Sequence, residues 1–357
     1  MSLTKEYNQA ASDMRRPGTE QADGKLDARE LIRHATLAAS SHNTQPWKFR
    51  IRNDSITILP DFSRRCPVVD PDDSHLFKSL GCAAENLVHA AAAQGFSAEV
   101  RFDSGENGIN VLLNRGPTVR ATDLYRAIPK RQCVKATYDG SPIGVTQLEK
   151  LEKAGEEPSV RTVMLSSDAQ KNAVIDFVTR GNITQLTDRA FRKELVAWIR
   201  FNPVEAMRKG DGLAAQTSGQ PALPTWLAKL IIGLVLTPKG QAETDATNIR
   251  SSAGVAVFVS SQDNKAAWIN VGRAYERFAL QATVLNIRTA LINQPIEVRQ
   301  LRPQFESWLK LDGEHALLIV RFGHGPTAPF SLRRPIDDVI IVDQTTNARK
   351  SYPVGHQ

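Results

Sequence analysis

The sequence lacks the short motifs that mark many common catalytic folds. Its 357 residues contain no phosphate-binding loop of the GxxxxGK[ST] or GxGxxG type, no HExxH pair and no GxSxG nucleophile elbow. The only cysteines, Cys66, Cys82 and Cys133, are too widely spaced to indicate a zinc site or a disulfide framework. Metal catalysis and serine hydrolysis are therefore disfavoured, and any cofactor has to be held by a different arrangement of residues.

Aromatic residues and clustered basic residues are also scarce. Phe, Trp and Tyr make up 6% of the chain, which argues against a base-stacking surface for single-stranded nucleic acid. The net charge is +7 and the isoelectric point about 9.4, but lysine and arginine are scattered without a long basic run. A basic nucleic-acid-binding protein is therefore a minor alternative, and we expect no nucleic-acid partner.

Membrane-spanning and secretory segments are not indicated. The longest apolar run, Trp226–Leu236, contains Lys229 and is shorter than the ~20 residues that cross a bilayer. Residues 1–25 are polar, without the apolar core of a signal peptide, and we expect a flexible tail there. Together with the few cysteines, these features predict a cytoplasmic protein with no membrane partner.

Hydrophobic periodicity predicts an α+β fold. The first part of the chain reads as helix, hairpin, helix, hairpin, while the second alternates less regularly, which argues against a doubly wound parallel sheet. The predicted helices span 26–40, 74–96, 122–132, 146–155, 168–200 and 266–286, the predicted hairpin 48–61, and the predicted strands 97–102, 109–114, 160–165, 253–261, 315–323 and 337–343.

A boundary between two unequal halves is predicted at Gly116-Pro117 and the polar stretch after it. We expect residues 26–117 to form the first half and residues 118–357 the second, which ends in a C-terminal tail. Within the second half, an insert of about 201–240 begins with a stretch rich in glycine, proline and small polar residues. So long an irregular insert predicts either a functional lid or a disordered segment.

The stretch SSHNTQPW, Ser40 to Trp47, concentrates short hydrogen-bonding side chains between an apolar helix and a strand. Taken alone, it could be a helix C-terminal turn, since serine and asparagine satisfy free carbonyl groups there. The apolar helix before it and the strand directly after it predict a buried corner, where polar groups need partners. A heterocycle with carbonyl and ring-nitrogen groups would supply such partners.

This stretch resembles the Ser-[Ser/Gly]-x-Asn-x-Gln-Pro-Trp motif of the nitroreductase family, which comprises FMN-dependent oxidoreductases with flavin sites built by two chains. In that family the motif contacts the flavin from the partner chain. The resemblance therefore implies cofactor binding by Ser40, Ser41, Asn43 and Gln45.

A second segment, AIPKRQCVKATY, is similar to the family's Arg-[Arg/His]-Ser-x-[Arg/Lys] clamp, although it could also be a basic surface turn. In the family this clamp stands near the N-terminus, but there Arg15-Arg16 is followed by Pro17 and the pattern fails. The resemblance implies that a lysine lies beside flavin N1 and O2 and stabilises the reduced form. The implied cofactor-binding residues are Arg131, Gln132, Cys133 and Lys135, of which Lys135 is the expected catalytic residue.

Two segments near the end of the chain resemble further parts of such a site. In LINQPIEV, which could also be an ordinary turn after a helix, the family's Pro-Ile-Glu segment brings backbone amides to flavin N5 and O4. Arg333-Arg334-Pro resembles a C-terminal basic pair that binds the FMN phosphate, a role that suits the planar fork of arginine. The cofactor-binding residues implied for the LINQPIEV segment are Gln294, Pro295, Ile296 and Glu297.

The distribution of these motifs resembles a dimer fused into one chain. One half-site motif lies in the first half and the complementary motifs lie in the second, as in the Acg-like, internally duplicated branch of the family. The resemblance implies a nitroreductase-like fold with two unequal halves around one flavin per chain. The fused chain would be a monomeric pseudo-dimer or would pair again as a homodimer.

The function implied by the resemblance is hydride transfer from NADH or NADPH through FMN to a small-molecule acceptor. The acceptor would be a nitroaromatic compound, a quinone or a similar molecule. The alternative is a non-enzymatic protein that binds FMN and sequesters it beneath a lid, because the insert could cover the face at which NAD(P)H must stack.

Overall fold

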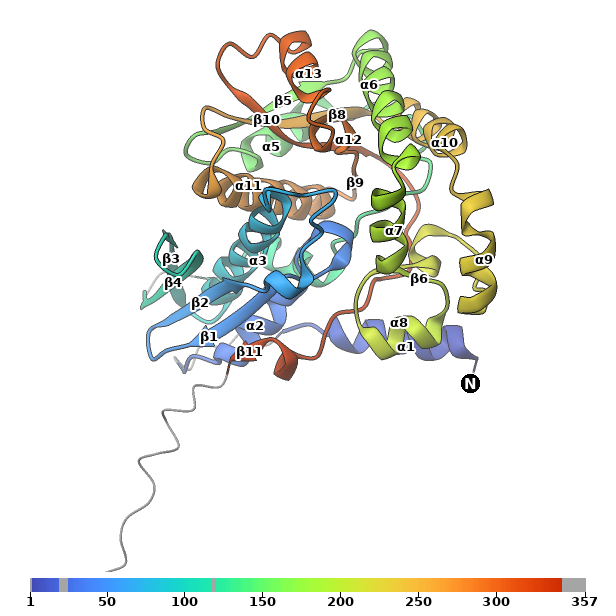
Figure 1. Cartoon of the computed structure of the whole chain (residues 1–357). Helices are drawn as coiled ribbons and strands as arrows, with labels where there is room; N and C mark the ends of the chain where they lie inside the picture. The colour runs from blue at the N-terminus through green and yellow to red at the C-terminus, as the bar shows by residue number, and fades with distance from the viewer. Residues whose placement is uncertain (1, 19–24, 117–119, 342–357) are drawn as a thin grey trace, which may run out of the picture.

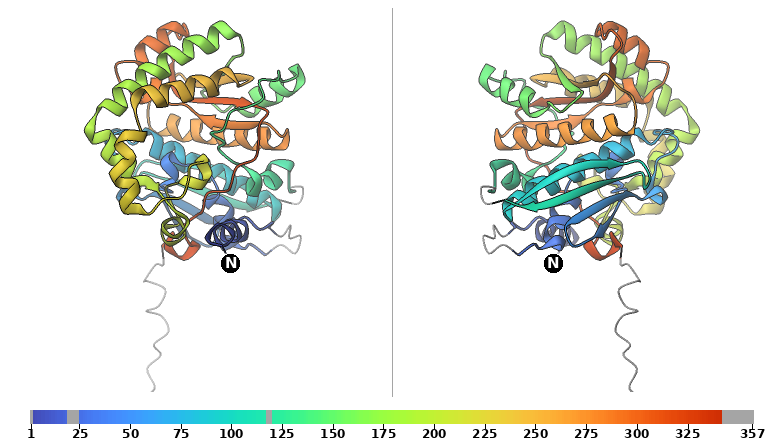
Figure 2. Two further views of the ribbon diagram at one scale, coloured as in Figure 1. Left: turned by 90° about the vertical axis from the view of Figure 1, so that its right-hand side faces the viewer. Right: turned by 90° about the vertical axis from the view of Figure 1, so that its left-hand side faces the viewer.

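The computed structural model describes residues 2–18, 25–116 and 120–341. Within them, helices pack on two main β-sheets, with a further two-stranded sheet beside them, which confirms the expected α+β class (Figure 1). The sheets enclose two long helices, α3 (Ser74–Ala93) and α11 (Lys265–Val284), and α3 packs on one sheet while α11 packs on the other (Figure 2). Among the described residues, no helix has the length and apolar character needed to cross a membrane.

The first sheet is built mainly by the first half of the chain, in the predicted pattern of helix and hairpins. The side chain of Asp27 caps the first of its helices by accepting a hydrogen bond from the amide of Glu30. A strand from the end of the chain, β11 (Ile340–Ile341), runs parallel to β1 at the edge of this sheet. The elements are α2 (Ala28–Thr36), β1 (Trp47–Ile51), β2 (Ser55–Pro60), β3 (Phe96–Asp103) and β4 (Gly108–Arg115), in the strand order β11-β1-β2-β4-β3.

The second sheet is antiparallel and lies in the second half. Its strand β8 is buried at every position, because α11 packs against one face of the sheet and a group of other helices against the opposite face. The strands, in spatial order, are β5 (Val160–Leu165), β8 (Gly254–Ser260), β10 (His315–Gly323) and β9 (Arg288–Leu291). Besides α11, the second half contains, outside the insert, the helices α4 (Asp123–Ala127), α5 (Val145–Ala154), α6 (Asp168–Thr187), α7 (Arg189–Trp198), α10 (Pro238–Arg250), α12 (Gln294–Glu297) and α13 (Arg302–Trp308).

Two expectations for the second half are corrected by the structure. The single helix expected over 168–200 is two helices, because the side chain of Asp188 accepts a hydrogen bond from the amide of Ala190 and starts a new helix there. The insert of about 201–240 is ordered rather than irregular. It contains α8 (Pro203–Lys209), α9 (Thr225–Val235) and β7 (Leu213–Ala214). Strand β7 pairs in parallel with β6 (Ile199–Arg200), which directly precedes the insert.

The N-terminal segment also differs from the expected flexible tail. Residues Leu3–Met14 form helix α1, which packs against α8 of the insert. Tyr7 and Ala11, one helical turn apart, are buried in a small core of their own, and the Tyr7 hydroxyl donates a hydrogen bond to the carbonyl of Phe330 at 2.9 Å. The apolar partners of this helix come from residues about 200 to 330 positions away, so its own composition does not reveal them.

The two halves meet where α3 crosses α11. A Cβ atom at Gly81 would overlap the carbonyl oxygen of Ile269, and one at Gly272 would overlap that of Lys78. Glycine at both positions therefore lets the two backbones approach more closely than any other residue would. This contact fixes how the first half sits on the second.

An ionic network reinforces the same crossing. The buried carboxylate of Glu85 on α3 accepts hydrogen bonds from Arg273 at 3.1 Å and from Arg277 at 2.6 Å, both on α11. Both arginines also pair with Glu157. Although burial alone would raise it, the pKa of Glu85 is held well below its ordinary value by His89 and the two arginines.

Replacement of Gly272 by alanine is expected to destabilise the fold by about 2–3 kcal/mol, because the added methyl group meets a backbone carbonyl that cannot rotate away. The matched control is Gly233→Ala on α9, where an added Cβ meets open space. That change should raise stability by up to about 1 kcal/mol, since alanine favours helix. Urea denaturation of both variants measures the difference. Equal stabilities would contradict the close crossing.

Candidate functional site

A cavity of about 320 Å³ lies at the meeting of the two halves and the insert. Its size is at the lower end of the range typical of small-molecule sites. Side chains of α3 and the segment after α2 form one side, α6 and α7 another, and residues 212–218 of the insert a third. The cavity is therefore a composite of segments that are far apart in the sequence.

Most of the residues expected at a cofactor site line this cavity. They come from both halves, as the fused-dimer arrangement requires. The residues that line it are Ser40, Ser41, Asn43, Arg131, Gln132, Cys133, Lys135, Gln294, Glu297 and Arg333. Gln45, Pro295, Ile296 and Arg334 were expected there too, but they are not among the lining residues.

The corner at residues 40–45 is a turn with unusual backbone angles. His42, Asn43 and Gln45 have φ values of 47°, 53° and 53°, in the left-handed region that non-glycine residues rarely adopt. Side-chain hydrogen bonds hold the turn: the Asn43 amide donates to the carbonyl groups of Gly212 at 3.1 Å and Leu332 at 3.2 Å. Such strain persists only where the surroundings fix it, and it is frequent at binding sites.

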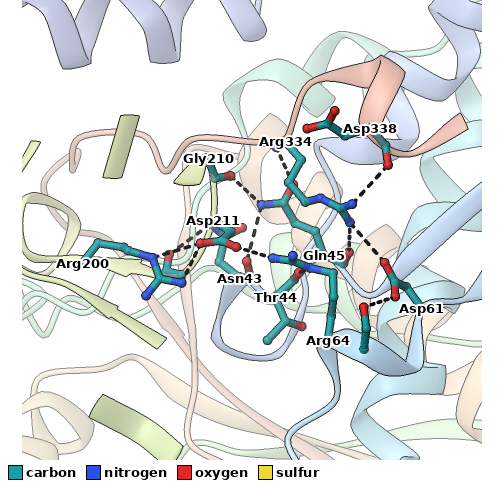
Figure 3. A network of polar contacts seen from close by, with 12 residues as sticks. Asn43, Thr44, Gln45, Asp61, Arg64, Arg200, Gly210, Asp211, Arg334 and Asp338 are labelled. Atoms are coloured by element: carbon teal, nitrogen blue, oxygen red, sulfur yellow. Dashed lines mark hydrogen bonds and ion pairs between the residues drawn. The ribbon is translucent and has the colours of Figure 1, made fainter. Parts of the chain in front are cut away.

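Gln45 and Arg334 do not line the cavity. Instead they bind each other and nearby carbonyl groups in a polar network that we call the clasp (Figure 3). The Gln45 amide donates to the carbonyl of Gly210 at 2.8 Å, and its oxygen accepts from the backbone of Arg334 at 2.8 Å. The Arg334 guanidinium donates to the carbonyl groups of Gln45 and Asp338. Because Pro335 keeps the residue before it extended, Arg333 and Arg334 point to opposite sides, and the two cations do not face one ligand.

The clasp also includes the buried carboxylate of Asp211, which holds the insert. Asp211 pairs with Arg64 of the first half and with Arg200, whose Nε and Nη2 lie 2.9 and 2.7 Å from its oxygen (Figure 3). Gly212 and Leu213, which follow directly, line the cavity. The clasp therefore sets the position of the wall that the insert contributes.

Three guanidinium groups gather at the C-terminal end of α2. Arg333 donates to the carbonyl groups of Thr36 at 2.8 Å and Leu37 at 3.0 Å, and Arg131 also donates to Leu37 at 2.8 Å. These carbonyl groups carry the partial negative charge of a helix end. Arg15 completes the cluster, donating to the carbonyl of Pro129 at 3.2 Å and lying 4.5 Å over the ring of Phe330.

The charge of this arginine cluster, Arg15, Arg131 and Arg333, is only partly balanced. Glu276 pairs with Arg131 at 2.8 Å. Burial and the neighbouring Arg131 lower the pKa of Arg333 to about 9, and burial with Arg333 lowers that of Arg15 well below its ordinary value. Within the described part of the chain, the Nε of Arg15 and the hydroxyl of Tyr275 have no hydrogen-bond partner although both are buried. An anion in the cavity would relieve both deficits.

Arg15 was missed in the sequence because the clamp pattern failed at Pro17. The signal that could have found it is the spacing of Tyr7 and Ala11, which places both on one face of a helix. Such a face predicts that the helix packs against the rest of the protein. Even so, the approach of Arg15 to the cavity depends on tertiary packing.

Outside the arginine cluster, Glu297 was expected at the site, whereas the cavity-lining His75 and Lys78 were not anticipated. Burial raises the pKa of Glu297 to about 7, with Asp70 adding to the shift and a 2.8 Å hydrogen bond from Gln185 opposing it. Burial lowers the pKa of Lys78 to about 8 and that of the nearby His75 well below its ordinary value. Groups that titrate near neutrality in a cavity are suited to holding or releasing a proton.

The helical turn α12 changes the expected role of the Gln294–Glu297 segment. The amides of Ile296 and Glu297 both donate to the carbonyl of Asn293 at 2.9 Å, so neither is free to approach a cofactor. Ile296 joins the core, whereas the side chains of Gln294 and Glu297 line the cavity. The segment therefore contributes side chains rather than those backbone amides.

Comparison with known proteins gives related sequences but no matching family model. The chain is 24% identical over 328 residues to a protein of Mycobacterium tuberculosis (strain H37Rv) named "Putative NAD(P)H nitroreductase", with 87% of this chain and 90% of the relative covered. The corresponding protein of strain CDC 1551 gives the same values.

Solved structures similar to the chain are more distant. A nitroreductase with bound FMN from Bacteroides fragilis is 12% identical, with 66% of this chain and 100% of that chain covered and a TM-score of 0.36. An FMN-dependent nitroreductase from Mycobacterium smegmatis, in complex with NADPH, is 13% identical, with 65% and 98% covered and a TM-score of 0.37.

Replacement of Glu297 by glutamine should alter how stability depends on pH. The carboxyl pKa rises from 4.5 to about 7 on folding, so its stabilising contribution is complete below about pH 4.5 and is lost as the pH rises through about 7. Glutamine is neutral throughout and lacks this loss. The free energy of unfolding of the wild type, relative to that of the variant, should therefore fall by on the order of 3 kcal/mol from low to high pH.

Denaturant unfolding of both proteins across this pH range measures that difference. His75, whose Nε2 lies 3.8 Å from Glu297 Oε1, is held neutral by burial and contributes the opposite slope in both proteins. Parallel pH profiles would contradict this prediction, because they would show that the pKa of Glu297 is the same in the folded and the unfolded chain.

Proposed function

We propose that this chain, which is related to nitroreductases as its motifs predict, is an oxidoreductase that uses FMN and takes hydride from NAD(P)H. The acceptor that we propose is a small molecule such as a nitroaromatic compound or a quinone. The observation that carries the proposal is the buried arginine cluster, with its partly balanced charge, against a cavity that also contains the polar corner at residues 40–43.

The residues present fit the phosphate of FMN. Most Arg333 donors are committed to backbone carbonyl groups, so this residue supplies positive charge more than free hydrogen bonds. Among the described residues, the buried Nε of Arg15 has no hydrogen-bond partner, and a phosphate oxygen is a strong acceptor for it. We therefore assign Arg15 as the principal phosphate donor, with Arg131 and Arg333 completing the charge.

The remaining polar groups suit the ring system of the cofactor. Ser40, Ser41 and Asn43 come from the first half, and Gln294 has a buried amide oxygen that lacks a partner in the described residues. When bound, FMN supplies the hydride chemistry. The chain would hold it, shield it from water, and keep a proton on Glu297 available near neutral pH.

The composite nature of the cavity supports one flavin per chain. The polar corner belongs to the first half, while Arg131–Lys135, Gln294, Glu297 and Arg333 belong to the second, so both halves are consumed in building a single site. Quantifying the flavin released from purified protein tests this: a ratio near one per chain is expected, and a ratio near two contradicts the pseudo-dimer.

A flavin-sequestering protein is the second candidate, favoured by the clasp at Asp211. Buried ion pairs with Arg64 and Arg200 hold the insert against the cavity, which could exclude NAD(P)H. Steady-state NAD(P)H oxidation with menadione or a nitroaromatic compound separates the two: turnover supports the oxidoreductase, whereas bound FMN without turnover supports sequestration. Purified protein free of flavin and unable to bind FMN would overturn both.

Arg15→Gln is expected to weaken FMN binding at least tenfold, because a charge-assisted hydrogen bond is worth about 1.5–3 kcal/mol. The matched control is Arg16→Gln, which removes the same charge from the adjacent residue. Its side chain is 59% exposed and pairs with Glu30 away from the cavity. Titration of flavin fluorescence with each protein gives the two affinities. If both variants bind FMN like wild type, Arg15 does not hold the phosphate.

Lys135→Ala should lower the flavin midpoint potential by tens of millivolts, where about 30 mV corresponds to 1.4 kcal/mol for a two-electron couple. Lys135 is exposed and lines the cavity, so its charge favours the more negative, reduced cofactor while solvent screens the effect. Lys130→Ala removes an exposed cation nearby in sequence that does not line the cavity. Spectroscopic redox titration should show a shift only for Lys135→Ala.

A further inference from the structure

Helix α9 presents an apolar face to solvent. Trp226, Leu230 and Leu234, which lie on one side of the helix at intervals of four residues, are 71%, 74% and 81% exposed. On the opposite side Ala228 is buried against the protein. A helix that is apolar on all sides is normally covered on all sides, and a contiguous exposed apolar patch marks an interaction surface.

The segment that carries α9 has an unusual charge pattern. Between Asp211 and Glu243, residues 212–242 contain no acidic residue, and their only charged side chains are Lys229 and Lys239. Lys229 lies on α9 itself and is exposed. Lys239 follows the helix, exposed, with a loose 3.9 Å pair to Glu243. An apolar stripe bordered by lysines is complementary to a surface that is apolar inside and anionic outside.

We propose that α9 docks this protein onto an anionic lipid membrane, with Trp226, Leu230 and Leu234 inserted at the interface and Lys229 among the headgroups. An amphipathic helix that lies in the membrane plane need not span it, so the short length of α9 is no obstacle. Tryptophan suits this depth because its ring is apolar and its N–H is polar. The proposal revises the expectation of no membrane partner and is independent of the proposed function.

A second copy of the chain fits this face less well. The 11 residues of α9 form a helix about 16 Å long and about 10 Å wide, far less than the roughly 800 Å² per partner of a stable protein interface. Symmetric pairing through the exposed stripe would also bring Lys229 toward its own copy. Insertion into lipid requires only the few side chains that α9 presents.

Co-sedimentation of the full chain with phospholipid vesicles tests the proposal. Wild-type protein should sediment with vesicles that contain phosphatidylglycerol, should bind vesicles of pure phosphatidylcholine much less, and should be released by salt as its electrostatic part is screened. Leu230→Ser combined with Leu234→Ser should weaken binding at least tenfold, while Lys229→Gln should affect only the vesicles with anionic lipid. Both side chains are exposed, so circular dichroism should show an unchanged fold.

The matched control is Val145→Ser combined with Ile183→Ser, which removes two exposed apolar side chains elsewhere and should bind like wild type. Failure of wild type to bind anionic vesicles, or equal loss in the control, would overturn the proposal. Sedimentation equilibrium covers the rival occupant. A dimer that dissociates on Leu230→Ser with Leu234→Ser would show that a second copy covers α9.

Discussion

The close crossing of α3 and α11 is the contact on which the rest of the molecule depends. Glycine at positions 81 and 272 lets the two backbones touch, and the Glu85 network fixes the angle at which they meet. Each helix then covers its own sheet and also presents side chains to the cavity, His75 and Lys78 from α3 and Tyr275 from α11. A shift at the crossing would therefore move opposite walls of the cavity relative to each other.

The cavity is a place where the fold accepts an electrostatic cost. Three guanidinium groups are buried together, and the carboxylate of Glu276 pairs with one of them, that of Arg131. Arg131 and Arg333 also donate to the carbonyl groups that end α2, whereas Arg15 donates to the carbonyl of Pro129. Buried like charges oppose folding unless they are compensated. Their persistence beside a cavity is most simply explained by an anionic ligand that completes the balance, which is the basis for the proposed cofactor site.

The sequence predicted the α+β class and most of the elements, because periodicity and turn chemistry are local properties. Of the polar corner that it predicted to be buried, Thr44 and Gln45 are buried, whereas residues 40–43 are half-buried and line the cavity. The sequence could not predict which residue of a pair points inward. Arg333 and Arg334 are adjacent, yet one enters the cluster and the other joins the clasp, since an extended chain alternates its sides. Arg15 and helix α1 were missed for a related reason, because the surfaces that bury them come from distant parts of the chain.

Strand β11 affects how the protein unfolds. The chain leaves the second sheet at Gly323, contributes Arg333 to the cavity, and then pairs β11 with β1 of the first sheet. The second half thus reaches around the site and supplies part of the architecture of the first. Because the sheet of the first half includes a strand from the second, the two halves should unfold in a single cooperative transition rather than as separable domains.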